Sequence, residues 1–378
     1  MQRYTNKTHR IAVGALFFFY GLCFASWASR IPSIQQNLKL SEAALGGVLF
    51  ALPIGLFISL PISGWLIAKI GSRRVILLSG ILYSCLLLGI GFSENVVQLI
   101  IALFFFGFSG NMLNISANTQ AVTLEARYDK PIMATFHGMW SLAGFAGAAI
   151  GTFMIAGGIF PAQHYLYISG FSLVIAFVSY HFLMHKDLQT AENSPLFSMP
   201  DRALFSLGAI AFCSMMCEGA MFDWSGVYFK KAVKVEPEWI GAGYTAFMIT
   251  MAGTRFLADN FTARYGLKKV LQVSGLFTAA GLMLSVIYPT LIMSIIGFLL
   301  VGIGVSSVVP LVYSAVGKSK TLSPGVAIAA VSTLGFFGLL LGPPVIGLIA
   351  GVTNLRTSFA ILAVMGLCVT FLATKAKY

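Results

Sequence analysis

Charged side chains are scarce in this chain of 378 residues. Only 10% of the residues are Asp, Glu, Lys or Arg, whereas 58% are hydrophobic and the mean hydropathy is +0.87. Soluble domains carry roughly 25% charged residues. A chain so poor in charge cannot cover a surface that faces water, so most of its outer face must meet lipid.

Acidic residues are half as numerous as basic residues, with 12 Asp and Glu against 24 Lys and Arg. A net charge of +12 would suit a nucleic-acid partner if the basic residues formed one face. They stand instead in short connectors beside apolar runs, where they act as orientation signals for a membrane protein. We therefore expect no nucleic-acid partner.

Cysteines and reactive motifs are also few. The five cysteines are an odd number and all lie within apolar runs, which excludes a disulfide framework. The sequence has no phosphate-binding loop, zinc signature or pairing of a nucleophile with a base. We expect a protein that is not an enzyme and needs neither a cofactor nor a metal.

What the chain does have is long apolar runs. A hydrocarbon core of ~30 Å needs ~20 apolar residues per helix, and on that basis the sequence predicts twelve spans. They fall near 11–30, 43–68, 75–92, 97–124, 132–157, 164–184, 203–228, 239–259, 269–288, 290–316, 325–350 and 356–374. The first run ends without a small-residue cleavage site, so we interpret it as a span and not as a signal peptide.

Two short basic segments repeat each other, because Ala68 to Arg74 matches Ala263 to Lys269 at an offset of 195 residues. A second repeat has an offset of 191 residues and joins Gly144, Gly147 and Gly151 to Gly335, Gly338 and Gly342. Such repeats indicate two equivalent halves, the usual construction of a membrane carrier. The fold class predicted is all-α, with two pseudo-symmetric bundles of six transmembrane helices.

The expected division is an N-terminal bundle at 1–184, a polar linker at 185–202 and a C-terminal bundle at 203–378. With the N-terminus inside, seventeen Lys and Arg fall on the cytoplasmic side and six on the opposite side. This bias predicts that both termini lie in the cytoplasm.

The repeated loop resembles the loop between the second and third spans in the major facilitator superfamily, which usually reads Gly-x-x-x-Asp-Arg-x-Gly-Arg-Arg. The matching residues are Gly64, Lys69, Gly71, Arg73 and Arg74, while Ala68 stands where the family has an acid. Four phrases are similar to bacterial inner-membrane carriers grouped with YbjJ, and more distantly to the fucose permease. They are Trp27 to Pro32, Phe136 to Leu142, Glu218 to Ser225, and Gly342 to Pro344 followed by Leu355 and Arg356.

The resemblance implies the major facilitator fold, transport by alternating access, and a place in the bacterial inner membrane. It also implies that the loop residues Lys69, Gly71, Arg73 and Arg74 take part in gating. Because both Ala68 and Ala263 replace the acid, we expect the inner gate to use other groups, with Arg255, Asp259 and Glu125 the first candidates. Arg255 and Asp259 are four residues apart and are predicted to pair within one helix.

A bend is predicted in the eleventh span, where Gly342 precedes Pro343 and Pro344. Two prolines remove two backbone donors and favour a bend. We include these three residues among the gating candidates.

Acidic residues inside a span are expensive and therefore functional candidates. Glu218 and Asp223 lie in the seventh span, and Glu218 is the preferred group for proton coupling. His137 in the fifth span is a third candidate, since histidine titrates in the working range. The alternative for both acids is a structural ion pair or a hydrogen bond between helices.

Substrate-binding candidates form stripes on several spans. Asn111, Asn114 and Asn118 project from one face of the fourth span, and their amides suit a polar, hydroxylated solute. The same amides could instead hold helices together, and aromatic residues near span ends could be interfacial anchors. The full set is Tyr20, Trp27, Arg30, Asn111, Asn114, Asn118, Trp140, Trp224 and Tyr313.

The function predicted is secondary active transport of a small polar solute, coupled to protons, by a monomer in the lipid bilayer. One alternative is a proton-antiport exporter of amphipathic compounds, whose cavity the 32 Phe and 15 Met residues could line. A receptor or a membrane-embedded enzyme is the other class considered. The sequence has neither the soluble output domain that a receptor would carry nor a set of catalytic residues that an enzyme would need.

Overall fold

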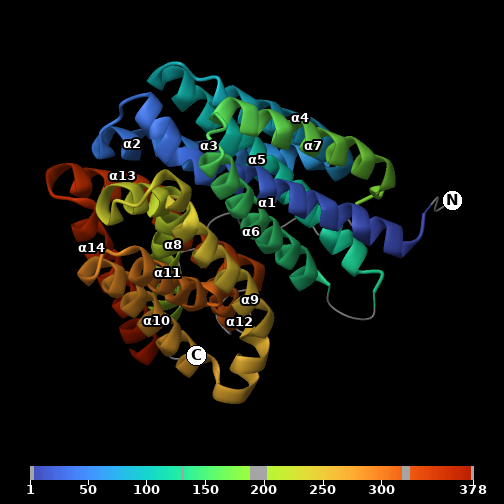
Figure 1. Ribbon diagram of the computed structural model, residues 1–378. Helices are drawn as coiled ribbons and strands as arrows, with labels where there is room; N and C mark the ends of the chain where they lie inside the picture. Colours follow the sequence, from blue (N-terminus) through green and yellow to red (C-terminus); the bar gives the residue numbers. More distant parts are fainter. Residues whose placement is uncertain (1–3, 129–131, 188–201, 317–323, 376–378) are drawn as a thin grey trace. The chain divides into compact units, whose positions relative to one another are not determined.

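The computed structural model describes residues 4–128, 132–187, 202–316 and 324–375, and the regular elements in these ranges are helices (Figure 1). The N-terminal helices are α1 (Asn6–Asn37), α2 (Glu42–Leu49), α3 (Ala51–Ile70), α4 (Ser72–Gly91), α5 (Val96–Glu125), α6 (Met133–Ala156) and α7 (Pro161–Phe182). The C-terminal helices are α8 (Arg202–Tyr228), α9 (Ala242–Tyr265), α10 (Leu267–Ile287), α11 (Leu291–Ser306), α12 (Val308–Val316), α13 (Pro324–Val352) and α14 (Leu355–Lys375).

Eleven helical stretches in the described ranges are long and apolar enough to cross a membrane. The remaining long helix, α9, carries Arg255, Asp259 and Arg264 and is therefore less apolar than the others. The prediction of an all-α, multi-pass membrane protein is confirmed.

The chain divides into two compact units, and each is described separately. One consists of Met1–Lys39 and Val48–Thr190, and the other of Leu40–Gly47 and Ala191–Tyr378. Most of the linker expected at 185–202 lies outside the described residues, which include only residues 185–187 and Arg202 of it.

The two units repeat one packing scheme. In the first, α1 packs against α6 and α7, α5 against α3 and α4, and α4 against α7, as Figure 1 shows for the neighbouring α4 and α7. In the second, α8 packs against α13 and α14, α11 against α9 and α10, and α10 against α14. The order of partners is the same in both, as a duplicated sequence requires.

The glycine stripes are helix contacts. A Cβ at Gly147 of α6 would lie 2.8 Å from the Ala25 side chain of α1, and one at Gly338 of α13 would collide with the Phe212 carbonyl oxygen of α8. Small residues let helices approach closely. The equivalent glycines thus join the equivalent helices of each unit.

The first helix is longer than the apolar run predicts. It continues through Pro32 to Asn37. Pro32 donates no backbone hydrogen bond, but the buried side chains of Ile31 and Ile34 continue the packing face of the helix, and membrane helices tolerate proline where neighbouring helices cover it. Arg30 therefore lies inside α1, 2% exposed, and not in the outer connector where the charge count had placed it.

Two predicted spans are interrupted, and a third ends in a wider turn. The second span breaks at Phe50 between α2 and α3, and the tenth breaks at Ser307 between α11 and α12. The seventh span ends in a π-helical turn, Phe229–Val233, which contains Lys230 and Lys231. Such irregular backbone often marks functional positions in helices.

Candidate functional site

An ion pair joins two helices of the C-terminal unit. Arg255 Nη2 on α9 donates a hydrogen bond of 3.1 Å to Glu218 Oε1 on α8. Both side chains are largely buried, with exposures of 22% for Arg255 and 12% for Glu218. The pair compensates two charges that would each be costly in a membrane-spanning segment.

Arg255 also contacts the point where the tenth span breaks. Its Nε donates to the carbonyl oxygen of Ser306, the last residue of α11, at 3.3 Å. The spacing of Arg255 and Asp259 predicts a pair within α9, but the Asp259 side chain lies outside the described residues. What the structure shows is Arg255 linking α8 to the end of α11.

Tyr313 belongs to the same neighbourhood. It lies on α12, forms a side-chain hydrogen bond with Ser332 of α13, and interacts electrostatically with Glu218. A change in the charge of Glu218 therefore acts on α9 through Arg255 and on α12 through Tyr313. The sequence predicted Glu218, Arg255 and Tyr313 separately, and the structure brings them together.

Asp223 lies apart from this group, nearer the π-helical end of α8. It interacts electrostatically with Tyr244 in the first turn of α9, and Tyr244 is 2% exposed. Neighbouring Trp224 is fully buried, and its Nε1 has no hydrogen-bond partner among the described residues. The two acids of α8 thus interact with different residues of α9, Glu218 with Arg255 and Asp223 with Tyr244.

An aromatic group in the N-terminal unit surrounds Tyr20. The ring of Tyr20 lies 5.6 Å from that of Tyr83 and 6.4 Å from that of Trp140, and Phe24 lies 6.3 Å from Trp140. His137, one turn before Trp140, contacts the edge of Phe17 at 5.4 Å. Tyr20 and Trp140, predicted from different spans, are neighbours.

The three asparagines of α5 have different surroundings. Asn111 is buried, and its Nδ2 donates to Ser59 Oγ at 2.8 Å and to the Leu56 carbonyl at 3.1 Å, which ties α5 to α3. Asn118 donates to Asn114 Oδ1 at 2.9 Å, and both remain partly exposed. Asn114 and Asn118 are thus the amides of this stripe that retain an accessible surface.

Arg30 lies in a buried cluster that includes a residue not predicted from the sequence. Its Nη2 donates to the Ile159 carbonyl oxygen, while its Nε has no hydrogen-bond partner among the described residues. His164 on α7 is fully buried, interacts electrostatically with Arg30, and also lacks a hydrogen-bond partner in the described part of the chain. Trp27, one turn before Arg30, is 1% exposed with an unpartnered Nε1 in the same ranges.

The first basic loop is held by two residues that sequence patterns missed. Gly71 has a φ of +82°, which suits glycine, and turns the chain from α3 into α4. The Ser72 amide then donates to Asp187 Oδ2 at 2.7 Å, and the buried Gln120 donates to Ser72 Oγ at 2.7 Å. An acid is therefore present at this loop, although it comes from the end of the sixth span and not from position 68.

The basic residues of this loop have different environments. Arg73 donates from Nε to the Tyr180 carbonyl at 3.0 Å and stacks over the Tyr180 ring at 4.2 Å. Lys69 lies 4.7 Å from the centre of the Trp65 ring, whereas Arg74 is exposed. Arg73 is thus anchored to α7 by a hydrogen bond and a ring contact together.

Two further gating candidates are at helix connections. Glu125 Oε2 accepts a bond of 2.6 Å from the Ile132 amide and so closes the connection between α5 and α6. Within the C-terminal unit, α13 stays helical through Gly342, Pro343 and Pro344, and a Cβ at Gly46 would lie 2.7 Å from the Pro343 carbonyl oxygen. The prolines thus lie where backbones approach closely.

A second ion pair of the C-terminal unit joins the segment 40–47 to the π-helical turn. Lys231 Nζ, in the π-helical turn, lies 2.7 Å from Glu42 Oε1. Both side chains are partly exposed, at 37% and 24%. Salt would therefore screen this pair more than the buried Glu218–Arg255 pair.

Comparisons with known proteins agree with this architecture. The family model described as Major Facilitator Superfamily matches residues 13–237 and 207–377. An uncharacterized transporter of Sinorhizobium fredii is 30% identical over 381 residues, covering 100% of both chains.

Solved structures show the same fold at low sequence identity. A mutant of the nucleoside transporter NupG superposes with a TM-score of 0.75 at 15% identity, covering 97% of this chain and 99% of the other. The fucose:proton symporter FucP of E. coli has a TM-score of 0.63 at 16% identity, covering 97% of this chain and 98% of the other.

Proposed function

Because the chain belongs to the Major Facilitator Superfamily, and is therefore a membrane transporter and not an enzyme, we propose that it couples proton movement to transport of a small polar solute. The resemblance to this superfamily noted from the loop motif is confirmed. The closer grouping with the YbjJ-like carriers stays a prediction.

The Glu218–Arg255 pair is the observation that supports proton coupling. When Glu218 binds a proton, its charge disappears and the ion pair between α8 and Arg255 is lost. The loss of this ion pair changes the interactions of Arg255 and so favours a different arrangement of α9 and of the α11 end that Arg255 also contacts. Proton binding and helix rearrangement are thereby linked through one side chain.

The solute class rests on groups of the N-terminal unit. Asn114 and Asn118 are partly exposed amides that offer both donors and acceptors, and the rings of Tyr20 and Trp140, 6.4 Å apart, offer aromatic faces. Amides and aromatic rings are both groups that suit hydroxylated solutes such as sugars, polyols and nucleosides. His137, Asp223, Trp27, Arg30, Trp224 and Tyr313 are retained as proposed proton-coupling or binding residues.

The test begins with purified protein screened by thermal shift against sugars, polyols and nucleosides, since a bound ligand raises the melting temperature. Compounds that stabilise the protein are then added to proteoliposomes containing a pH-sensitive dye. We expect the wild type to move protons with the solute, and Glu218→Gln to exchange solute by counterflow without moving protons. Glu94→Gln, an exposed acid at the start of α5, is the matched control.

Two results would contradict the proposal. Proton movement by Glu218→Gln at the wild-type rate would exclude Glu218 as the coupling group. If lipophilic dyes alone stabilise the protein and are expelled from cells that express it, the export of amphipathic compounds is the correct function.

We also propose that the protein is a monomer of the bacterial inner membrane, with bundles at 1–184 and 203–378 joined by a cytoplasmic linker at 185–202. The excess of basic residues in the loops predicted to be cytoplasmic supports this orientation. A phosphatase that is active only outside the cytoplasm should be inactive when fused to the C-terminus. An active fusion would reverse the orientation.

A further inference from the structure

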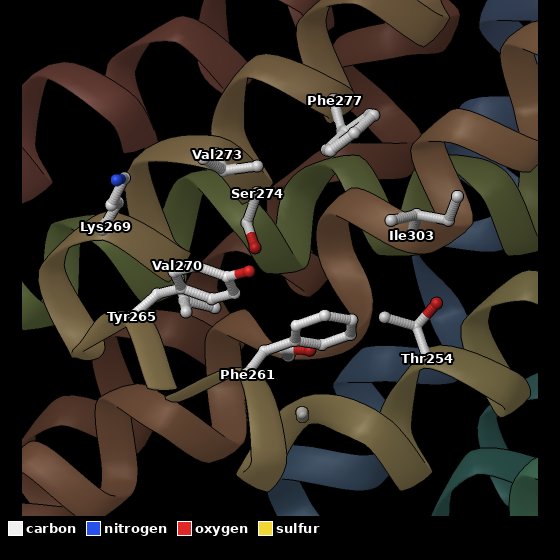
Figure 2. Close-up of a pocket in the computed structure, with 11 residues that line it drawn as sticks. Thr254, Phe261, Tyr265, Lys269, Val270, Val273, Ser274, Phe277 and Ile303 are labelled. Atoms are coloured by element: carbon white, nitrogen blue, oxygen red, sulfur yellow. The ribbon is translucent and has the colours of Figure 1, made fainter. Parts of the chain in front are cut away.

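An open groove runs along the C-terminal unit between α9, α10 and α11. Its volume is about 450 Å³, and its lining is almost wholly apolar, with Phe261, Tyr265, Val273, Phe277 and Ile303 among the residues. Figure 2 shows these side chains around the groove, with Lys269 at one end and Thr254 and Ile303 at the other. Neither Glu218 nor Arg255 is among the residues that line the groove.

The groove lies on a face that meets lipid. Phe261, Tyr265, Val273 and Phe277 are between 37% and 48% exposed, on helices from an all-α membrane protein. Exposed apolar residues on such a surface face hydrocarbon chains. The occupant of this groove must therefore be compatible with the bilayer.

The length of the groove matches one leaflet. Its lining residues on α9 extend from Thr254 to Tyr265, which at about 1.5 Å per residue is ~16 Å. Half of a hydrocarbon core of ~30 Å is ~15 Å. Tyr265 is the last residue of α9, so the groove begins at the membrane surface and ends near the midplane.

The mouth of the groove is positively charged. Lys269 lines it, Arg264 lies over the Tyr265 ring at 5.4 Å, and Lys268 is exposed beside them. Within the described part of the chain, no carboxylate forms an ion pair with any of these three residues. In the N-terminal unit, the loop that precedes α4 is bound by Asp187.

We propose that this groove binds one acyl chain of an anionic phospholipid, with the lipid phosphate at Lys269. The apolar groove by itself gives little preference for one lipid over another, since the acyl chain leaves one apolar environment for another. The basic residues at its mouth supply the preference, because basic residues at a membrane surface attract anionic headgroups. The loop lies on the side that the distribution of Lys and Arg assigns to the cytoplasm, so the lipid belongs to that leaflet.

Fluorescence quenching by brominated lipids tests whether the acyl chain lies in the groove. The full-length protein, with its native cysteines replaced, carries a fluorescent label at Phe277→Cys in the groove or at Leu276→Cys, a neighbour that is 50% exposed and does not line it. We expect brominated phosphatidylglycerol to quench the groove label at a several-fold lower mole fraction than the neighbouring label. Brominated phosphatidylcholine should quench both labels alike.

Charge variants test the headgroup contact. Lys269→Gln should reduce the preference of the groove label for phosphatidylglycerol about fivefold, while Lys268→Gln, in the same loop but outside the groove, should reduce it less. Equal quenching of both labels by both lipids would overturn the proposal and leave only ordinary bilayer contact. So would a preference that Lys269→Gln leaves unchanged.

Native mass spectrometry of the unlabelled protein checks the same site without the cysteine variants. The wild type should retain phosphatidylglycerol in preference to phosphatidylcholine, and Ala258→Phe, which fills the groove, should lose it while its melting temperature in detergent shows that it is folded. Equal retention by the wild type and by folded Ala258→Phe, or a groove filled by detergent or by a second copy of the chain, would refute the lipid assignment.

Discussion

The carboxylate of Asp187 accepts a hydrogen bond of 2.7 Å from the backbone amide of Ser72, the first residue of α4. The first amides of a helix have no partner within the helix, and the helix dipole makes this end positive. Gln120 of α5 donates to Asp187 Oδ1 at 3.3 Å and to the Met184 carbonyl at 3.1 Å, so its amide binds the segment 184–187 at two points. The end of the sixth span is thereby attached to the loop that resembles the family motif.

Asp187→Asn should destabilise the protein by about 1 to 2 kcal/mol. The substitution removes the negative charge at the start of α4 and weakens two charge-assisted hydrogen bonds. Thermal unfolding in detergent measures the effect. Glu94→Gln is the control, because Glu94 is exposed. An equal melting temperature for Asp187→Asn and the wild type would contradict this role.

The Glu218–Arg255 pair predicts a non-additive mutant cycle. Arg255→Gln should cost about 3 kcal/mol, because it removes the cation that pairs with the largely buried Glu218 carboxylate. The double variant Glu218→Gln with Arg255→Gln should be more stable than Arg255→Gln alone, since no charge then remains unpaired at this position.

Denaturation of the three variants and the wild type gives the coupling energy of this cycle. A coupling close to zero would mean that the two side chains stabilise the protein independently. In that case the pair could not transmit the protonation of Glu218 to α9.

The glycine stripe of α13 predicts a difference between two conservative substitutions. Gly338→Ala should lower stability by about 1 to 3 kcal/mol, because the added Cβ collides with the Phe212 carbonyl and forces α13 away from α8. Gly253→Ala on α9 should leave stability unchanged or raise it, since no atom lies within 4 Å of its Cβ position. Melting temperatures in detergent decide this, and equal effects of the two substitutions would exclude close packing as the reason for the stripe.

The asparagines of α5 predict a separation of stability from transport. Asn111→Ala should cost about 1 kcal/mol, because it removes the two bonds to α3. Asn118→Ala should change the melting temperature less, since Asn118 donates its hydrogen bonds to Asn114 on the same helix. It should also weaken the thermal shift caused by the solute. A solute response that survives in Asn118→Ala and disappears in a folded Asn111→Ala would assign binding to the other end of the stripe.

Much of the architecture was accessible from the sequence. Apolar runs and the two repeats predict an all-α membrane protein with two similar halves, and the basic loop predicts its family. Helix ends were less predictable, because Pro32 is compatible with a helix when the buried residues beyond it continue the packing face. Periodicity likewise gave no sign of the breaks at Phe50 and Ser307, which interrupt apolar runs without a change in composition.

The candidate site could be predicted only in part. Scarcity of charge in the spans indicated Glu218 and Arg255 one by one, but helical spacing relates only residues of the same helix. It therefore paired Arg255 with Asp259, four residues away, and could not indicate a partner on α8, 37 residues away. His164 and Asp187 had no motif at all, since their importance arises from Arg30 and Ser72, residues distant in the chain.

The sequence by itself determined that the outer face meets lipid, that the chain has two similar halves, and which loop carries the family pattern. These properties depend on composition and on the local order of residues. Tertiary structure alone decided that Asp187 reaches Ser72 across 115 residues and that Glu218 pairs with Arg255. The physical reason is that a buried charge must find a partner wherever packing brings one close. That partner is selected by distance in space, which helix periodicity does not specify.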